Sequence, residues 1–525
     1  MTDRVKSLAG DDRRHTRALA RGTVLAAAGK ITQLIDPLGM LVFAHLYGAE
    51  TLGLYVVLMA YVDGASRATI FAMPKTLQRF VPANPDDAHA IVRIAMIVPV
   101  VTGIVAALTI SLTAPVLAGL IRIGPASGGG IAPAVGLCGW LIPLRALMRV
   151  PLNAVRARQQ FGPDMYIRTL IEPLIWLVAG TIFSAADPGL YGLVGARLVS
   201  FGTAALLSLG VLVRRFDLEK LLRPAPASRR SLWADMLGFS AVTVIYDFMH
   251  YLEGRLDVLL LGALLSGPSG AAAVGAYGVA RTLSGSVIWG RKSMDYAVGP
   301  IASELHARRE IDSLRESYAA TTRWELCLST PIIATILTLR TDILGLFGPE
   351  FLVASTAVVI LCVGRALDEI TGSTALILAM IGRPQAPLFN EVAATALSAT
   401  LMWALVPSFG ITGAALAASA GFAVANLAAF VEIWIILGIQ PYDRRFLRAF
   451  SFSCAGVTVL LAAQWLAAQT GLGFVNGRIE VTAVWAVAFI PAYLRYGLPA
   501  EDRALANEGL ERLRARVQHA IAQSG

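Results

Sequence analysis

Long hydrophobic runs, separated by short polar intervals, recur along nearly the whole chain. Many of these runs reach the roughly 20 residues that a helix needs to cross a bilayer. Only helices or closed barrels satisfy backbone polar groups in lipid, and the alternating pattern of a barrel is absent. The pattern therefore predicts an all-α polytopic membrane protein with about 14 transmembrane helices. The predicted spans are 21–46, 51–73, 89–119, 131–153, 166–185, 190–213, 236–265, 272–297, 320–343, 351–380, 388–407, 411–437, 448–469 and 480–497.

The polar intervals alternate in charge. One set is short and contains no Lys or Arg: 48–50, 187–189, 266–270 and 407–410. The other set is basic: 156–158, 214–230, 308–315, 444–445 and the two ends of the chain. By the positive-inside rule, the basic intervals and both termini face the cytoplasm, and an even number of spans agrees with that orientation.

Composition supports a membrane protein. The 525 residues are 56% hydrophobic and 15% charged, whereas ordinary globular domains carry about 25% charged residues. The net charge of +9 gathers in the cytoplasmic intervals, so it reflects topology and gives no support to nucleic-acid binding. No cleavable signal peptide is expected, because the charged first twenty residues precede a run long enough to span. The four scattered cysteines lack C-x-x-C spacing, and neither a metal site nor a cofactor is predicted.

Several apolar segments recur about 220 residues apart, a spacing that indicates an internal repeat. Gly53-Leu54-Tyr55 returns as Gly275-Ala276-Tyr277, residues 144–147 return as 364–367, and residues 192–198 return as 410–416. About six helices separate the copies, so both have the same orientation in the membrane and form parallel repeats. Secondary transporters are built from such repeats, with the working site between them.

The repeat predicts two pseudo-symmetric six-helix lobes followed by two extra helices. The expected parts are a cytoplasmic tail 1–20, an N-lobe 21–213, a cytoplasmic linker 214–235, a C-lobe 236–437, two further helices in 438–497, and a cytoplasmic amphipathic tail 498–525. Apolar residues on one face among arginines lead us to expect that the last segment lies on the anionic inner leaflet.

Ionisable residues lie inside the predicted spans, where each costs roughly 2.5–3.5 kcal/mol on insertion scales. Two groups are candidates for function. The expected substrate-binding cations are Lys30, Arg67, Arg145, Arg149, Arg281 and Arg365. The expected ion-coupling or cavity residues are Asp36, Asp63, His250, Glu253 and Asp257. Because many of these residues lie in the helices that open the two copies, we expect a hydrated, mainly cationic chamber between them. Arginine forks would there favour an anionic headgroup such as a diphosphate.

Structural alternatives remain open for several of these residues. Asp63 and Arg67 are spaced i,i+4 and could satisfy one another. His250 could be a packing histidine, and Asp257 could pair with Arg255 or with a neighbouring helix. Each of these would be a contact between helices without a ligand.

Four segments resemble the polysaccharide flippases, in order and at matching spacing from about residue 20 to 440. Residues 46–55 resemble their L-G-P-x-x-x-G-x-Y segment, although Ala49 replaces the usual proline. The other three resemble their D-x-x-L-L-G…V-G-x-Y, L-F-G-x-x-F and G-I-x-G-A-A segments, and occupy 255–277, 346–351 and 409–415. This family comprises the Wzx-type lipid-linked oligosaccharide flippases, within the superfamily that also holds multidrug extruders and the MurJ-type flippase.

The resemblance implies a transporter, not an enzyme, with a two-lobed fold in a bacterial inner membrane. It implies that an undecaprenyl-diphosphate-linked oligosaccharide crosses to the periplasmic leaflet by alternating access, for biosynthesis of a polysaccharide such as lipopolysaccharide or exopolysaccharide. The expected partners are this lipid-linked glycan, membrane lipids, H+ or Na+ as the coupling ion, and other polysaccharide-assembly membrane proteins. Two alternatives are a cation-coupled multidrug extruder of the same superfamily and a membrane glycan polymerase or ligase. The extruder would use Asp36 beside Pro37, whereas the enzyme would need longer outward loops than those predicted.

Overall fold

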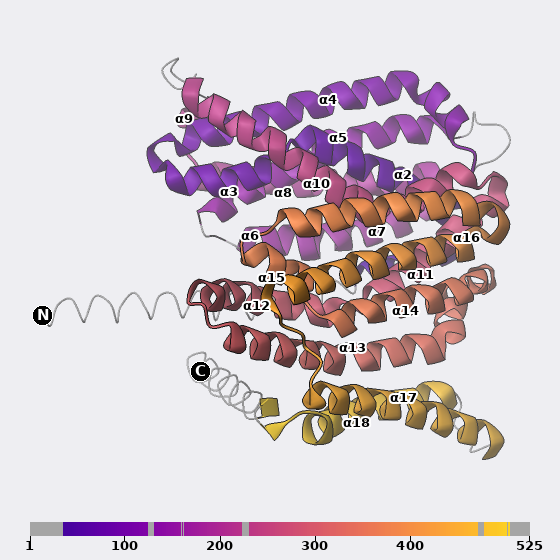
Figure 1. Ribbon diagram of the computed structural model, residues 1–525. Coiled ribbons are helices and arrows are strands. Elements are labelled where there is room, and N and C mark those ends of the chain that lie inside the picture. The colour runs from indigo at the N-terminus through magenta and orange to yellow at the C-terminus, as the bar shows by residue number, and fades with distance from the viewer. Residues whose placement is uncertain are drawn as a thin grey trace, which may run out of the picture. The chain divides into compact units, whose positions relative to one another are not determined.

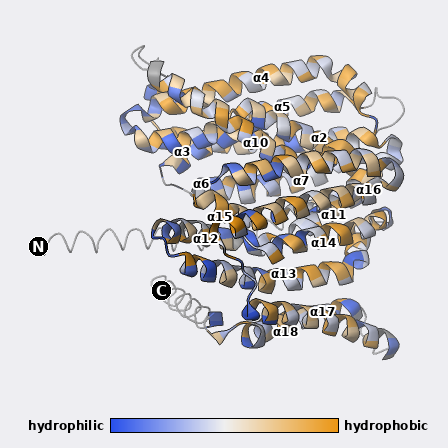
Figure 2. Cartoon of the chain, viewed as in Figure 1, coloured by the Kyte–Doolittle hydropathy of each residue, from blue (hydrophilic) through white to orange (hydrophobic). Residues whose placement is uncertain are grey.

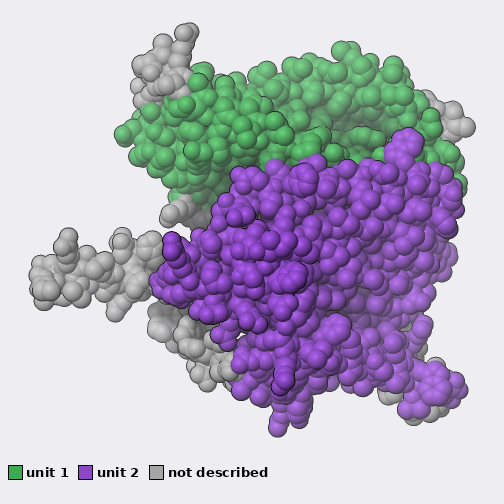
Figure 3. All heavy atoms as spheres, viewed as in Figure 1, with its two compact units in different colours: residues 1–278 green, residues 279–525 purple. Residues whose placement is uncertain are grey.

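A computed structural model describes residues 35–123, 131–158, 160, 162–222, 230–470, 477–500 and 502–503. Within these ranges the ordered elements are helices and no strand occurs, which confirms the predicted all-α class (Figure 1). The chain divides into two compact units, 1–278 and 279–525, which Figure 3 colours separately. The lobe boundaries that the repeat leads us to expect stay a prediction.

Unit 1 is a bundle of long helices. Its elements are α2 (Ile35–Ile70), α3 (Met73–Ala83), α4 (Ala88–Leu120), α5 (Ala132–Ala157), α6 (Gly162–Met165), α7 (Glu172–Ala186), α8 (Leu190–Arg215), α9 (Leu218–Leu222), α10 (Arg230–Leu264) and the first part of α11 (Gly267–Gly285). A short 3-10 turn, Pro85–Asp87, precedes α4, and a π turn, Tyr166–Ile171, joins α6 to α7. Helix α5 packs against α4 and α8, whereas α2 lies against α5, α7 and α10.

The core of unit 1 is apolar and tightly closed. Met73 and Leu77 of α3, Ile91 of α4 and Ala154 of α5 are fully buried, and Met236 of α10 joins them. Burial of a side chain of this size stabilises a fold by about 1.5–3 kcal/mol relative to exposure in water. With Leu212 of α8 and Leu221 of α9, this cluster ties α3 to five other helices and so holds the polar segments that these helices carry in fixed positions.

Two glycines break long helices at predicted intervals. Gly48 has φ +76°, a conformation that glycine adopts readily, and it divides α2 into two helices. Gly410, with φ +55°, divides α16 (Gln385–Leu437) in the same way. Both fall within the short intervals without Lys or Arg, 48–50 and 407–410, so these two predicted turns are confirmed.

Unit 2 holds the remaining helices. They are the end of α11, α12 (Trp289–Ala307), α13 (Ile311–Phe347), α14 (Ser355–Thr371), α15 (Thr374–Met380), α16, α17 (Arg444–Thr470) and α18 (Gly477–Ala492), with a 3-10 turn at Pro349–Ala354 and a π turn at Tyr493–Gly497. Helix α13 packs against α12, α14, α17 and α18, while α16 packs against α14 and α15. Helix α13 therefore links the C-terminal helices to the rest of the unit.

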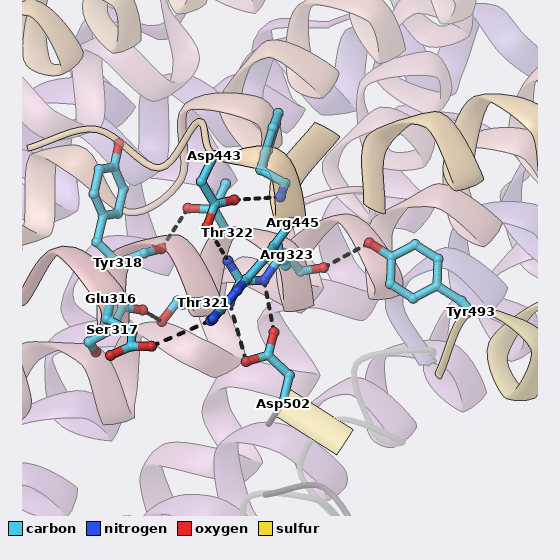
Figure 4. A network of polar contacts seen from close by, with 11 residues as sticks. Glu316, Ser317, Tyr318, Thr321, Thr322, Arg323, Asp443, Arg445, Tyr493 and Asp502 are labelled. Carbon is cyan, nitrogen blue, oxygen red and sulfur yellow. Dashed lines mark hydrogen bonds and ion pairs between the residues drawn. The ribbon is translucent and has the colours of Figure 1, made fainter. Parts of the chain in front are cut away.

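A buried arginine fastens the C-terminal helices to α13 (Figure 4). Arg323 is 1% exposed, and its Nε lies 2.8 Å from Oδ2 of Asp502. A second carboxylate, that of Asp443 between α16 and α17, lies 3.7 Å from the Nη1 of the same guanidinium. The Tyr493 hydroxyl donates to the Arg323 carbonyl at 3.1 Å. Removal of Arg323 or of Asp502 would leave the other as a buried, unpaired charge. The ion pair between them therefore fixes the last two helices to α13.

The described residues contain eleven helices long and apolar enough to cross a membrane, so the chain is a multi-pass membrane protein. Two of them, Pro37–Ala83 and Gln385–Leu437, include the glycine breaks at Gly48 and Gly410 and therefore each hold more than one helix. The number of about 14 spans stays a prediction. Figure 2 shows apolar residues along α4, α5 and α16, and polar residues on α12 and at the start of α13.

Candidate functional site

The expected site residues fall in both units. Unit 1 contains Asp63 and Arg67 on α2, Arg145 and Arg149 on α5, and His250 and Asp257 on α10; unit 2 contains Arg281 on α11 and Arg365 on α14. Lys30 and the tail segments 1–20 and 504–525 lie outside the described residues, as do the side chains of Asp36 and Glu253.

Asp63 forms an ion pair with Arg145, which joins α2 to α5. The two side chains are 24% and 14% exposed, so the pair is largely buried. The i,i+4 neighbour Arg67 instead lies over the ring of Tyr251, 5.0 Å from its centroid. The acid of α2 is thus bound to an arginine from another helix, an arrangement that the spacing within α2 does not predict.

A second buried ion pair lies beside the first. Arg197 of α8 reaches Glu172 of α7 with 2.7 Å between Nη1 and Oε1. Its guanidinium also lies over two aromatic rings, 4.6 Å from the Trp176 centroid and 4.5 Å from that of Phe201. Arg145 approaches the same Phe201 ring at 5.5 Å. The shared ring and the mutual electrostatic influence of Arg145 and Arg197 make the two ion pairs one group.

Glu172 and Arg197 are functional candidates that the sequence analysis does not include. Both lie within predicted spans, 166–185 and 190–213, where a charged residue is costly. The signal that could have found them is a single acid and a single base in adjacent apolar runs. The predicted span 166–185 also holds Arg168, and Arg197 is the only charged residue of the predicted span 190–213, so no series of charges along one helix marks either residue.

Arg149 completes the group on the next turn of α5. Its Nε makes no hydrogen bond although it is buried from solvent. The positive charges of Arg67 and Arg168 act on it, and its backbone carbonyl accepts a hydrogen bond from the Asn153 amide at 2.8 Å. We call Arg67, Arg145, Arg149 and Arg197, with Asp63 and Glu172, the arginine cluster. Four guanidinium groups face two carboxylates, so the cluster has an excess of positive charge.

The expected acids of α10 have structural partners. Asp257 is 6% exposed, and its Oδ2 accepts a hydrogen bond from the Tyr277 hydroxyl of α11 at 2.9 Å. Its Oδ1 accepts from the Val258 amide at 2.8 Å. The His250 ring stacks on Tyr246 with 6.4 Å between centroids. These contacts favour a role for Asp257 in holding α11 to α10, the neighbouring-helix alternative.

Unit 2 has a separate charged group on α14. Arg365 pairs with Asp368 at 3.1 Å and lies over the Phe422 ring at 3.6 Å. Arg291 of α12 reaches the same carboxylate at 3.7 Å, and the Asn426 amide donates to it. Arg365 is therefore partly neutralised by Asp368, whereas Arg149 of the arginine cluster keeps a buried nitrogen without a hydrogen bond.

Long apolar helices with buried arginines between them define a multi-pass membrane protein. The chain belongs to the polysaccharide biosynthesis protein family, whose family model matches residues 77–355. It is also similar to the probable low-salt glycan biosynthesis flippase Agl15 of Haloferax volcanii, with 22% identity over 390 residues, 74% of this chain and 77% of that protein.

Two solved structures show the same fold. The lipid II flippase MurJ in an inward closed conformation has a TM-score of 0.69 and 12% identity, and the match covers 90% of this chain and 99% of that one. An inward-facing multidrug resistance transporter of the MATE family, in the MOP superfamily, has a TM-score of 0.61 and 15% identity, covering 78% and 94%. These two matches show the fold. The family model and the glycan flippase relative bear out the predicted resemblance to the polysaccharide flippases, and the matched proteins are flippases and transporters, not enzymes.

Proposed function

We propose that this protein is a flippase that moves an undecaprenyl-diphosphate-linked oligosaccharide from the cytoplasmic to the periplasmic leaflet of a bacterial inner membrane. Both termini face the cytoplasm in this proposal. The cycle exposes a cationic binding site alternately to the two sides, and the product serves polysaccharide biosynthesis. The arginine cluster is the observation that carries the proposal, and the family and the glycan flippase relative support it.

The cluster suits a diphosphate for a physical reason. A guanidinium presents a planar fork of N–H donors that binds phosphate oxygens in bidentate, charge-assisted pairs. Asp63 and Glu172 form ion pairs with Arg145 and Arg197. Arg67 lies over the Tyr251 ring, and Arg149 is influenced by the charges of Glu172 and Asp164 without a hydrogen bond to its Nε. In this proposal a diphosphate replaces the missing acidic partner, and the lipid tail remains in the bilayer.

The second candidate is a cation-coupled multidrug extruder, favoured by the structural match to the MATE transporter. A cationic drug is attracted by acidic and aromatic walls and repelled by arginine. The excess of positive charge in the cluster therefore supports the flippase more than the extruder. The polymerase or ligase alternative has no such observation in its favour.

The test uses proteoliposomes that contain a fluorescent undecaprenyl-diphosphate-linked oligosaccharide. A membrane-impermeant quencher reports how fast the lipid changes leaflet. Arg149→Gln removes a cation that has no carboxylate bound to it in this cluster, so the fold should survive. We expect at least a roughly tenfold slower flipping, because a hydrogen bond to a charged group contributes about 1.5–3 kcal/mol.

Two control variants and two further substitutions define the outcome. Arg149→Lys keeps the charge without the fork and should fall between wild type and Arg149→Gln. Arg214→Gln changes an exposed arginine at the end of α8 and should flip at the wild-type rate. Arg67→Gln and Arg281→Gln should abolish export in cells at normal protein abundance. Unchanged flipping in Arg149→Gln would reject the cluster as the binding site, and a loss of abundance alone would assign these arginines to packing.

A further inference from the structure

A break in a predicted membrane span lies at the junction of α14 and α15. Helix α14 ends at Thr371, Gly372 follows with φ +74°, and α15 begins at Thr374. A side chain on Gly372 would place its Cβ 2.4 Å from the Thr322 hydroxyl oxygen, so glycine is required there. The Tyr318 hydroxyl donates to the Thr371 carbonyl at 2.5 Å. Helix α13 therefore holds the broken end, and in transporters such breaks occur where a helix lines a site.

Ser373, the residue after the glycine, lies between two carboxyl groups. Its Oγ is 2.6 Å from Oδ1 of Asp295 on α12 and 2.8 Å from Oε1 of Glu325 on α13. A hydroxyl has one hydrogen and can donate it to only one of these oxygens. The other short contact needs a carboxyl group that donates to Oγ. One of the two acids, Asp295 or Glu325, therefore carries a proton.

Burial makes Glu325 the better holder of this proton. Glu325 is fully buried, and its second oxygen, Oε2, has no hydrogen-bond partner. Asp295 is only partly buried, and the charges of Lys292 and Arg291 on the same helix act on it. Arg291 and Asp295 are also the charged groups that act on Glu325. An ionised carboxylate in a dry site is costly unless it is paired. The proton therefore resides on Glu325, whose hydroxyl donates to Ser373, while Ser373 donates to the ionised Asp295.

Glu369 repeats this situation one turn before the break. It is fully buried, and neither of its carboxyl oxygens has a hydrogen-bond partner. The nearby cations do not pair with it directly: Arg365 is 3.1 Å and Arg291 is 3.7 Å from Asp368. The charges that act on Glu369 are those of Glu325, Arg291 and Asp368. Tyr318 from α13 adds a hydroxyl that is already donated to Thr371.

The donor set of this site favours a proton as the ligand. Within the described part of the chain, no three His, Cys, Asp or Glu side chains come close enough together to hold a metal ion. A carboxyl pair bridged by a hydroxyl needs only a hydrogen to be satisfied. Monovalent sodium is kept as an outcome of the test below.

We propose that Asp295, Ser373 and Glu325, with Glu369, form a proton-binding site at the break between α14 and α15, and that proton exchange there drives the transport cycle. The second clause of this proposal rests on the proposed function. Binding forms an O–H bond on a Glu325 carboxylate oxygen, and release returns the proton to water. After release, two carboxylates flank one hydroxyl, and their repulsion pushes α12 and α13 away from the break.

This site differs from the ion-coupling residues that the sequence leads us to expect, Asp36, His250 and Glu253. Asp36 lies on α2, and His250 and Glu253 lie on α10, whereas the four groups here come from α12, α13, α14 and the junction of α14 with α15. Three groups of this site are also buried: Glu325 and Glu369 fully, and Ser373 to the extent that only 5% of it is exposed.

Infrared spectroscopy of the purified full-length protein in nanodiscs tests the site itself. A protonated buried carboxyl group gives a C=O stretching band that ionisation removes. We expect wild type to show such bands at neutral pH, and Glu325→Gln and Glu369→Gln each to lose one of them. Ser373→Ala keeps every carboxyl group but should shift the Glu325 band, because its hydrogen bond is gone. Glu304→Gln, an exposed acid on α12 whose side chain is 59% exposed, should leave the bands unchanged.

Flipping under an imposed pH gradient tests the role in transport. Wild-type flipping should depend on the gradient, whereas Glu325→Gln, which imitates the protonated acid, should lose this dependence. If the bands behave as expected but wild type does not flip the glycan lipid, the proton site stands and the proposed function fails. Identical carboxyl bands in wild type and Glu325→Gln would overturn the site. A band that sodium removes at constant pH would overturn the proton as its ligand.

Discussion

Replacing Gly53 with alanine inserts a methyl group where α2 crosses α11 within unit 1. The added Cβ would lie 1.8 Å from the Ala271 carbonyl oxygen and 2.8 Å from the Gly275 amide nitrogen. The crossing is reciprocal, because a Cβ on Gly275 would lie 2.4 Å from the Ala49 carbonyl oxygen. Gly53 and Gly275 are the equivalent glycines of the sequence repeat. Helices α2 and α11 thus approach closely through two glycines, as tightly packed membrane helices do.

The size of the effect follows from these distances. Alanine in an ordinary helix position is more stable than glycine by roughly 0.5–1 kcal/mol. Atoms in van der Waals contact are separated by about 3.5–4.0 Å, so a 1.8 Å approach requires the two helices to move apart. The obstacles are backbone atoms, which no rotamer change can relieve. Overpacking of this kind costs about 1–3 kcal/mol and occasionally more, and we expect the upper end.

Thermal unfolding of the purified protein in detergent measures this change. Gly238→Ala on α10 is the matched control, since no atom lies within 4 Å of the added Cβ. The control should unfold at the wild-type temperature or slightly above, and Gly53→Ala clearly below. The double variant with Gly275→Ala should lose less than the sum of the two single losses, because one separation accommodates both methyl groups. Equal stability of Gly53→Ala and Gly238→Ala would refute the close crossing.

Two further predictions concern buried charges. Asp63→Asn leaves Arg145 without its acid and should lower the free energy of unfolding by about 3–5 kcal/mol, while a double variant with Arg145→Gln should recover part of that loss, as chemical denaturation can measure. Arg323→Met should destabilise the protein by a similar amount of about 3–5 kcal/mol because Asp502 is left buried and unpaired, and limited proteolysis should then cleave near the C-terminal helices earlier than in wild type. Full resistance of Arg323→Met to proteolysis would contradict the anchoring role of this contact.

The sequence predicts the helices of this fold well and their contacts poorly. The apolar runs and the short intervals without Lys or Arg between them locate the turns at Gly48 and Gly410, because a bilayer-spanning helix must be long and apolar. The repeat identifies Gly53 and Gly275 as equivalent residues. It cannot show that they meet, because contact between two helices depends on packing that no periodicity within one helix encodes.

The same limit applies to the candidate site. The i,i+4 spacing of Arg145 and Arg149 places both on one face of a predicted span. That spacing does not show that Arg145 pairs with Asp63, which lies on another helix. The sequence does not identify Glu172 and Arg197 as site residues, because they form an ion pair between two different helices. The break at Gly372 lies inside the predicted span 351–380, which also carries Arg365 and Glu369. The pattern predicts one continuous span there and does not show that Ser373 lies between carboxyl groups of two other helices.

The central claim is that the protein moves an anionic, diphosphate-linked glycan lipid. The most direct measurement compares, in the same proteoliposomes, the protein-dependent leaflet exchange of this lipid with the protein-dependent movement of a lipophilic cationic dye. If this claim holds, we expect fast exchange of the glycan lipid, strongly slowed by Arg149→Gln, and no movement of the dye. Movement of the dye with no exchange of the glycan lipid would contradict it and would establish a drug extruder instead.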